Sequence, residues 1–299
     1  MRAVNDTDVL VALEQAIPAL RPAEQRIARA ILKSPSIVGD STIVQLAAAC
    51  QTSTTTVARF VTALGFTGYP ELRVAVSAAV GRAQAERARF SVQESDVDPN
   101  DSAEQVVSKI AYQEVGAIEQ TAKTIDLTVL DAVVDAIDTA DRIDLFGVAS
   151  SGLAAQDLQQ KLHRIGLVSY CWLEPHLALT SAALLTERSV AIAFSHSGLT
   201  LEAYHVLQTA AGTGARTVAV TNFPDSPLAE LADLSLITAA RETRFRSGAM
   251  SSRIVQLAVV DFLFVRIAQR RFDRLGTNLA LTYEAVQSHR LTPGKRVRP

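Results

Sequence analysis

The second half of the chain alternates short apolar runs with amphipathic segments. Each apolar run is bounded by glycine or polar residues, a pattern typical of buried strands. Alternating strands and helices predict a parallel sheet covered by helices on both faces, a flavodoxin-like α/β fold. The five predicted strands are 142–148, 167–173, 190–194, 217–221 and 234–237, and the helices that follow them are 153–165, 176–185, 201–212, 228–232 and 250–270.

The first third of the chain has helical periodicity only. Pro22 at a first helical position and an acid in the first turn predict a helix over 24–33. Two shorter helices follow, 43–49 and one capped by Ser53 that ends at Gly65. Two short helices joined by a tight turn predict a helix-turn-helix in an all-helical domain. A plain helical bundle with a hydroxyl-rich cap is the alternative.

The second helix of this pair presents hydroxyls and one arginine on its polar face. Such side chains hydrogen-bond DNA phosphates and base edges, and the small ones allow close approach to the major groove. The predicted DNA-binding residues are Ser53, Thr54, Thr55, Thr56 and Arg59. Only eight basic residues face six acidic ones in the first 85 positions. Because phosphate neutralisation supplies most non-specific affinity, we expect DNA to be bound by a dimer or a larger oligomer.

Two turns rich in hydroxyls follow predicted strands, 147–152 after the first and 195–200 after the third. A strand-to-helix turn offers free backbone N–H groups and the positive end of a helix dipole, which suit a phosphate. An ordinary turn with a Ser/Thr cap is the alternative. Ala149 breaks the glycine fingerprint of dinucleotide sites, and neither turn carries the lysine of a P-loop. A phosphorylated polyol or sugar fits best.

Length and composition add little beyond this division. A chain of 299 residues predicts two domains, and a net charge of −2 favours no partner class. Cys50 and Cys171 match no metal or redox spacing, so no metal and no cofactor are expected. The acidic start does not match a secretory signal, and the longest apolar stretch, 254–265, is interrupted by polar residues and too short for a bilayer. We expect a cytoplasmic protein that does not enter membranes.

Several stretches resemble one family of bacterial regulators. Residues 20–28 (LRPAEQRIA), 53–60 (STTTVARF) and 64–69 (LGFTGY) resemble the N-terminal helix-turn-helix of the RpiR/MurR family. Residues 146–152 (FGVASSG), 195–200 (SHSGLT) and 252–254 (SRI) resemble the sugar isomerase (SIS) domain that those regulators carry. The resemblance implies a transcriptional regulator of carbohydrate genes that binds an operator and a sugar-phosphate effector as a homodimer or homotetramer.

The domain boundaries follow from the same division. They are a helix-turn-helix domain over 1–81, a charged linker over 82–103, the SIS domain over 104–285 and a basic tail over 286–299.

The family pattern also implies which residues hold the phosphate. The implied ligand-binding residues are Ser150 and its neighbour Ser151 in the first turn and Ser195, His196, Ser197 and Thr200 in the second. His196 stands where other SIS domains often have glutamine, and its backbone N–H matters more than its side chain. Ala149 replaces the usual glycine, so this turn is expected to be less permissive.

A catalytic SIS domain, in a sugar-phosphate isomerase or an aminosugar-phosphate enzyme, is the alternative function. It needs a general base, and Glu174, His176, Glu202, His205 and Glu242 are the candidates. Glu202 and His205 also fit the exposed face of a helix, and Glu242 lies in a charged run, whereas Glu174 and His176 follow a strand end and are the best candidates. No catalytic residue is assigned, and a non-enzyme is expected. Whether Glu174, His176 or Arg253 lines the pocket stays open, as do the identity of the sugar and the direction of regulation.

Overall fold

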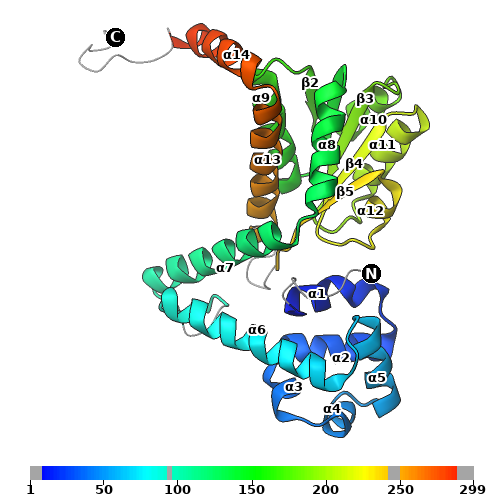
Figure 1. Ribbon diagram of the computed structural model, residues 1–299, viewed down its shortest axis with the longest axis vertical. Coiled ribbons are helices and arrows are strands. Elements are labelled where there is room, and N and C mark those ends of the chain that lie inside the picture. The colour runs from blue at the N-terminus through cyan, green and yellow to red at the C-terminus, as the bar shows by residue number, and fades with distance from the viewer. Residues whose placement is uncertain (1–8, 93–95, 242–249, 288–299) are drawn as a thin grey trace.

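The computed structural model describes residues 9–92, 96–241 and 250–287. Its N-terminal part is a bundle of helices around one core (Figure 1). Leu13, Ile27, Leu46 and Phe60 are fully buried there. The elements are α1 (Val9–Ala16), a 3-10 turn (Ile17–Ala19), α2 (Pro22–Lys33), α3 (Ser36–Asp40), α4 (Ile43–Ala49), α5 (Thr54–Ala63) and α6 (Tyr69–Arg89).

The helix-turn-helix predicted from the sequence is formed by α4 and α5. The Thr42 hydroxyl accepts from the N–H of Gln45, which closes a capping box at the start of α4. Gln51 has a φ of +49° in the turn, and the Ser53 hydroxyl accepts from the N–H of Thr56 at the start of α5. The buried faces of both helices pack into the core, so the polar face of α5 is left exposed.

The C-terminal part contains the predicted five-stranded parallel sheet, in the order β2-β1-β3-β4-β5. The strands are β1 (Arg142–Gly147), β2 (Ser169–Trp172), β3 (Ser189–Phe194), β4 (Arg216–Thr221) and β5 (Leu234–Ile237). The helices are α7 (Ala103–Thr124), α8 (Leu127–Thr139), α9 (Ser150–Arg164), α10 (Pro175–Ala182), α11 (Leu201–Gly212), α12 (Pro227–Leu231), α13 (Ser251–Arg270) and α14 (Phe272–Ala285).

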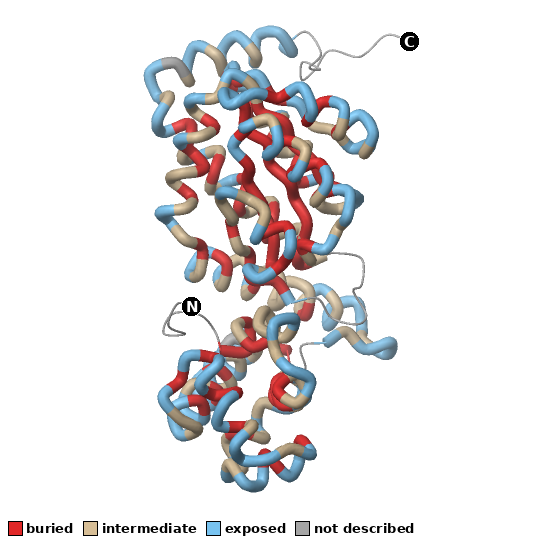
Figure 2. The backbone as a smooth tube through the Cα atoms, turned by 90° about the vertical axis from the view of Figure 1, so that its right-hand side faces the viewer, coloured by how far each residue is buried: buried red, intermediate tan, exposed pale blue. Residues whose placement is uncertain are grey.

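The sheet is the middle of three layers. One apolar core joins α8, α9 and α13 to one face, and a second core joins α10, α11 and α12 to the other. Every residue of β3 is buried, as expected for a central parallel strand covered on both sides. Figure 2 shows the buried strands enclosed by helices with exposed outer faces.

Neither α3 nor α14 was expected from the sequence. α3 is only five residues long and follows Pro35, where the preceding helix was expected to end. α14 continues past the expected end of the last helix and is held by Asn278, whose Nδ2 donates to the carbonyl of Ile165 over 2.8 Å. The predicted basic tail lies outside the described residues from position 288 onward. Among the described helices, none combines the length and apolar character that crossing a bilayer requires.

Candidate functional site

The two hydroxyl-rich turns lie next to each other at the carboxyl edge of the sheet. β1 and β3 are neighbours, and their register pairs Gly147 with Phe194, the last residue of each strand. The chain then leaves in opposite directions, because α9 packs against one face of the sheet and α11 against the other. This is the topological switch point, where open α/β sheets form their ligand crevice.

The first turn brings strand and helix unusually close together. A Cβ on Gly147 would lie 2.7 Å from the carbonyl group of Ser151, and one on Gly152 would lie 2.7 Å from the carbonyl oxygen of Gly147. Only glycine therefore fits at either position. Ser150 and Ser151 form the first turn of α9, are half-buried, and have no side-chain hydrogen bond within the described residues. Their hydroxyls are available to a ligand, whereas the N–H groups of Ser151 and Gly152 donate to the carbonyls of Val148 and Ala149 over 3.1 and 3.0 Å.

Between the strand and the serines, Ala149 has a φ of +52° and a ψ of −123°. A side chain rarely adopts this backbone region, and holding one there costs on the order of 1–3 kcal/mol. The sequence-based expectation of a less permissive turn therefore has a concrete cause, since the methyl group occupies a glycine conformation.

The second turn is closed by its own hydroxyls. Ser195 is buried; its Oγ accepts from the N–H of Gly198 over 3.1 Å and lies 2.9 Å from Oγ1 of Thr200. Ser197 is half-buried, and its Oγ accepts from the N–H of Leu199 over 3.2 Å. Gly198 has a φ of +65°, and a Cβ there would overlap the Ser226 hydroxyl. The hydroxyls thus shape a tight loop that leads into α11.

His196 joins this loop to the next strand. Its carbonyl oxygen accepts from the N–H of Asn222 over 3.0 Å and from the Thr221 hydroxyl over 3.1 Å. Its ring lies edge-on to Phe223, with centroids 5.8 Å apart. Asn222 is 1% exposed although it is polar. Thr221 and Asn222 were not expected from the sequence; Thr221 is the last residue of β4 and Asn222 follows it directly.

The start of α13 lies level with the start of α9. Lys161 of α9 is paired with Asp261 of α13 over 2.8 Å, each about ten residues into its helix. Beyond this pair, Asn278 of α14, the helix that follows α13, bonds Ile165 at the end of α9. The two helices therefore run in the same direction, and Arg253 in the first turn of α13 lies at the same edge as the start of α9. Arg253 is half-buried.

The candidate bases are spread over helix surfaces. Glu174 caps α10 by accepting from the N–H groups of His176 and Leu177, and these bonds hold the pKa of its carboxyl below the ordinary value. His176, Glu202 and His205 are exposed, and the His205 ring lies 6.1 Å from that of Tyr204. Glu242 lies outside the described residues. A carboxylate with a lowered pKa and two helix-cap bonds is a poor general base at neutral pH.

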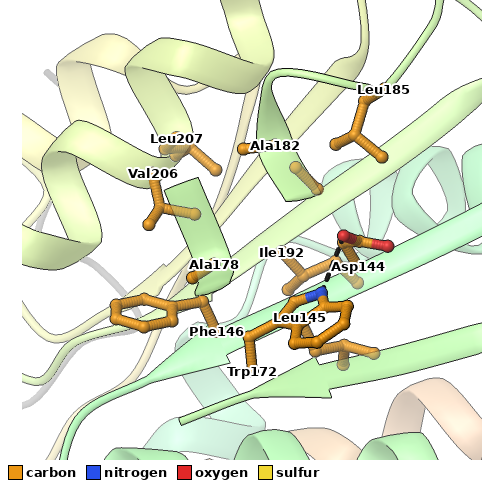
Figure 3. Close-up of a pocket in the computed structure, with 11 residues that line it drawn as sticks. Asp144, Leu145, Phe146, Trp172, Ala178, Ala182, Leu185, Ile192, Val206 and Leu207 are labelled. Atoms are coloured by element: carbon orange, nitrogen blue, oxygen red, sulfur yellow. Dashed lines mark hydrogen bonds between the residues drawn. The ribbon is translucent and has the colours of Figure 1, made fainter. Parts of the chain in front are cut away.

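The sheet domain contains a small internal void, and the helical domain has a larger surface groove. A void of about 10 Å³ lies under α10 and α11 and is lined mainly by apolar side chains such as Phe146 and Ala178; the hydrogen bond from Trp172 to Asp144 borders it (Figure 3). It has room for about one water molecule, so it cannot hold a sugar. The described residues contain no group of His, Cys, Asp or Glu side chains able to hold a metal ion.

The larger hollow is a groove of about 550 Å³ on the helical domain. It runs between α2 and α5 and is lined by Arg21, Glu24, Thr55, Ala58, Arg59, Thr62 and Ala63. Two of the predicted DNA-binding residues, Thr55 and Arg59, belong to it.

The other three predicted DNA-binding residues lie at the start of α5. Ser53 Oγ lies 3.0 Å from Thr56 Oγ1 and accepts the Thr56 N–H over 3.1 Å, so these two residues form the helix cap. Thr54, Thr55 and Arg59 are exposed on the polar face, with no hydrogen bond from their side chains among the described residues. Of the five predicted DNA-binding residues, Ser53 and Thr56 therefore stabilise the start of α5, and Thr54, Thr55 and Arg59 are exposed to a partner.

Comparisons with known proteins assign both parts of the chain. Residues 7–82 match the model of the helix-turn-helix domain of the rpiR family, and residues 136–266 match that of the SIS domain. An uncharacterized HTH-type transcriptional regulator from Caldanaerobacter subterraneus subsp. tengcongensis is 33% identical over 285 residues, which cover 95% of this chain and 99% of that protein.

Two solved structures share this architecture. The Vibrio vulnificus NanR protein complexed with ManNAc-6P has a TM-score of 0.61 and 26% identity, over 95% of this chain and all of that one. The sugar isomerase domain of an RpiR transcription factor from Sphaerobacter thermophilus has a TM-score of 0.56 and 25% identity, over 60% of this chain and 99% of that one. The first likeness spans both domains.

Proposed function

Since the chain belongs to the RpiR family of helix-turn-helix transcriptional regulators with a SIS domain, we propose that it senses a phosphorylated sugar and regulates carbohydrate genes. The observation that carries this proposal is the pair of hydroxyl-rich turns brought together by the β1–β3 register. The NanR structure, which is similar over both domains, contains a phosphorylated sugar derivative, and this supports the same ligand class here.

In this proposal the phosphate lies between the starts of α9 and α11. Two helix N-termini and several hydroxyls offer hydrogen-bond donors to an anion there. The ligand-binding residues are Ser150, Ser151, Ser195, His196, Ser197 and Thr200, with His196 contributing its backbone. Ser150 and Ser151 contribute hydroxyls that have no other partner among the described residues, whereas Ser195 and Thr200 chiefly set the shape of the loop.

The operator is read by α5. Thr54, Thr55 and Arg59 contact DNA, and Ser53 and Thr56 hold the start of the helix in place. The weak positive charge of the helical domain favours a homodimer or homotetramer, because paired recognition helices double the phosphate contacts. The protein acts in the cytoplasm, with the helix-turn-helix domain over 1–81, the linker over 82–103, the SIS domain over 104–285 and the tail from 286.

Sensing is favoured over catalysis. Isomerisation of a sugar phosphate requires a base within hydrogen-bond reach of the substrate. Glu174 is committed to a helix cap, and its lowered pKa weakens it as a base. The named relative is a regulator, which agrees with a domain that binds a sugar phosphate without turning it over.

Calorimetric titration of the full chain with a panel of sugar phosphates tests the ligand class. We expect one member to bind and to remain unchanged by mass spectrometry. The double variant Ser195→Ala/Ser197→Ala should lose at least about tenfold in affinity. Loss of the Ser197 hydroxyl removes one bond to a charged group, which contributes about 1.5–3 kcal/mol, and loss of the Ser195 hydroxyl removes a bond that shapes the loop. Ser235→Ala is the matched control, because the Ser235 hydroxyl donates to the carbonyl of Ala229 and belongs to neither turn. Turnover of the bound sugar would instead favour the isomerase function.

A further inference from the structure

One helix of the DNA-binding domain contacts the sheet of the other domain. α1 lies between the two parts of the molecule (Figure 1). The side-chain amide of Gln15 donates to the carbonyl oxygens of Asn222 and Thr238, both over 3.0 Å. Next to it, Glu14 pairs with Arg241 over 2.8 Å. The carbonyls that Gln15 reaches directly follow β4 and β5, at the same edge of the sheet as the two hydroxyl-rich turns.

A short path leads from this contact to the second turn. Asn222 accepts from Gln15 through its carbonyl and donates through its N–H to the carbonyl of His196 over 3.0 Å. Its side-chain oxygen accepts from the Thr238 hydroxyl over 3.2 Å and from the N–H of Ala240 over 2.7 Å. Asn222 and Thr238 are each 1% exposed. One buried residue therefore separates Gln15 from the loop between Ser195 and Thr200.

The opposite side of α1 belongs to the DNA-binding core. Leu13 is fully buried, and Val9 and Leu10 join it in the same cluster. α1 contacts α2 and α6, and α2 contacts α5. A displacement of α1 is therefore passed through packed side chains to the recognition helix.

We infer that Gln15 transmits occupancy of the turn 195–200 to the DNA-binding domain. The inference rests on the proposed function, because it takes this turn as the anion site. A phosphate that engages the backbone N–H groups of the turn reorients the peptide of His196. Because Asn222 bonds His196, this movement shifts the carbonyls of Asn222 and Thr238. The two hydrogen bonds from Gln15 to these carbonyls, which connect α1 to the sheet domain, are then strengthened or broken.

The ion pair beside Gln15 contributes much less. The Glu14 and Arg241 side chains are 29% and 44% exposed, and exposed pairs of this kind are weak. Gln15 donates to the backbone carbonyls of two buried residues. A buried backbone carbonyl is fixed in place, whereas an exposed side chain can rotate into solvent. In allosteric proteins one ligand typically changes the affinity for the other by about 5- to 150-fold. The two hydrogen bonds of Gln15 contribute a free energy of the same order.

Hydrogen exchange on the full chain tests the inference, with inorganic phosphate as the probe. Gln15→Ala should speed exchange at Gly198, Asn222 and Ala240 by about two- to tenfold relative to the parent protein. The matched control is Gln25→Ala, since Gln25 Nε2 donates to the Leu20 carbonyl within the helical domain. This control should leave those amides unchanged, and Glu14→Gln should have a small effect.

The response to phosphate separates transmission from a structural role. In the parent protein, phosphate should change exchange both in the turn and in α1. In Gln15→Ala it should change exchange in the turn only. Equal responses of α1 in both proteins would overturn the inference while leaving the anion site intact. If phosphate protects the turn in none of these proteins, the proposed anion site is wrong. The Gln15 contact is then tested by itself, because unchanged exchange at Asn222 in ligand-free Gln15→Ala would overturn its role.

Discussion

Ala149 is the residue whose backbone departs furthest from ordinary geometry in the candidate site. Its positive φ places a methyl group where glycine is normally required, between a strand end and the two serines that we propose as ligand contacts. Strain of this kind persists when the surrounding contacts fix the backbone. Here Gly147 and Gly152 permit the close approach that fixes it.

Replacing this alanine by glycine should therefore stabilise the protein. We expect Ala149→Gly to raise the free energy of unfolding by about 1 kcal/mol, because the relief of strain exceeds the entropy cost of a glycine. Chemical denaturation followed by circular dichroism measures it. Ala132→Gly inside α8 is the control and should lose about 1 kcal/mol. A loss of stability in both variants would show that Ala149 is not strained.

At the level of elements, the polar residues of α5 fall into two groups: some cap the helix, and others are exposed to a partner. Arg59 is exposed, has no ion pair among the described residues, and lines the groove with Arg21. Ser53 and Thr56 are occupied by the helix cap.

Arg59→Ala should weaken operator binding and lower the slope of log affinity against log salt by about one per bound α5, since one phosphate contact is lost. Sugar-phosphate affinity should stay the same. Fluorescence anisotropy over a salt series measures both the affinity and the slope. Arg188→Ala, which removes an exposed arginine of the sheet domain, should behave like the parent protein. Unchanged operator binding by Arg59→Ala would reject α5 as the reading helix.

Hydrophobic periodicity was sufficient to predict the five strands, their parallel arrangement and the two helices of the helix-turn-helix. It failed at glycines and short helices. The helix after β1 was predicted from 153 but begins at Ser150, because Gly152 resembles a loop residue although it is required for close packing. α3 was missed because a five-residue helix is too short to show periodicity.

At the scale of the whole molecule, the contacts between domains could not be predicted. Gln15 bonds two carbonyl oxygens more than 200 positions away, and backbone carbonyls leave no trace in a sequence pattern. The adjacency of the two hydroxyl-rich turns could be predicted, because neighbouring parallel strands end at the same edge. The segment before α7 is also packed more closely than a solvated linker suggests, since Lys109 is buried against Asp101 and the Asp96 carbonyl.

If the proposed function is correct, a sugar phosphate bound at the β1–β3 edge changes the affinity of the chain for its operator. The most direct measurement is the dissociation constant for promoter DNA with and without the sugar phosphate identified by titration. We predict a change of about 5- to 150-fold in the parent protein. The Ser195→Ala/Ser197→Ala variant should lose the response and keep the ligand-free affinity. A full response in that variant would show that the sugar phosphate does not act through this turn.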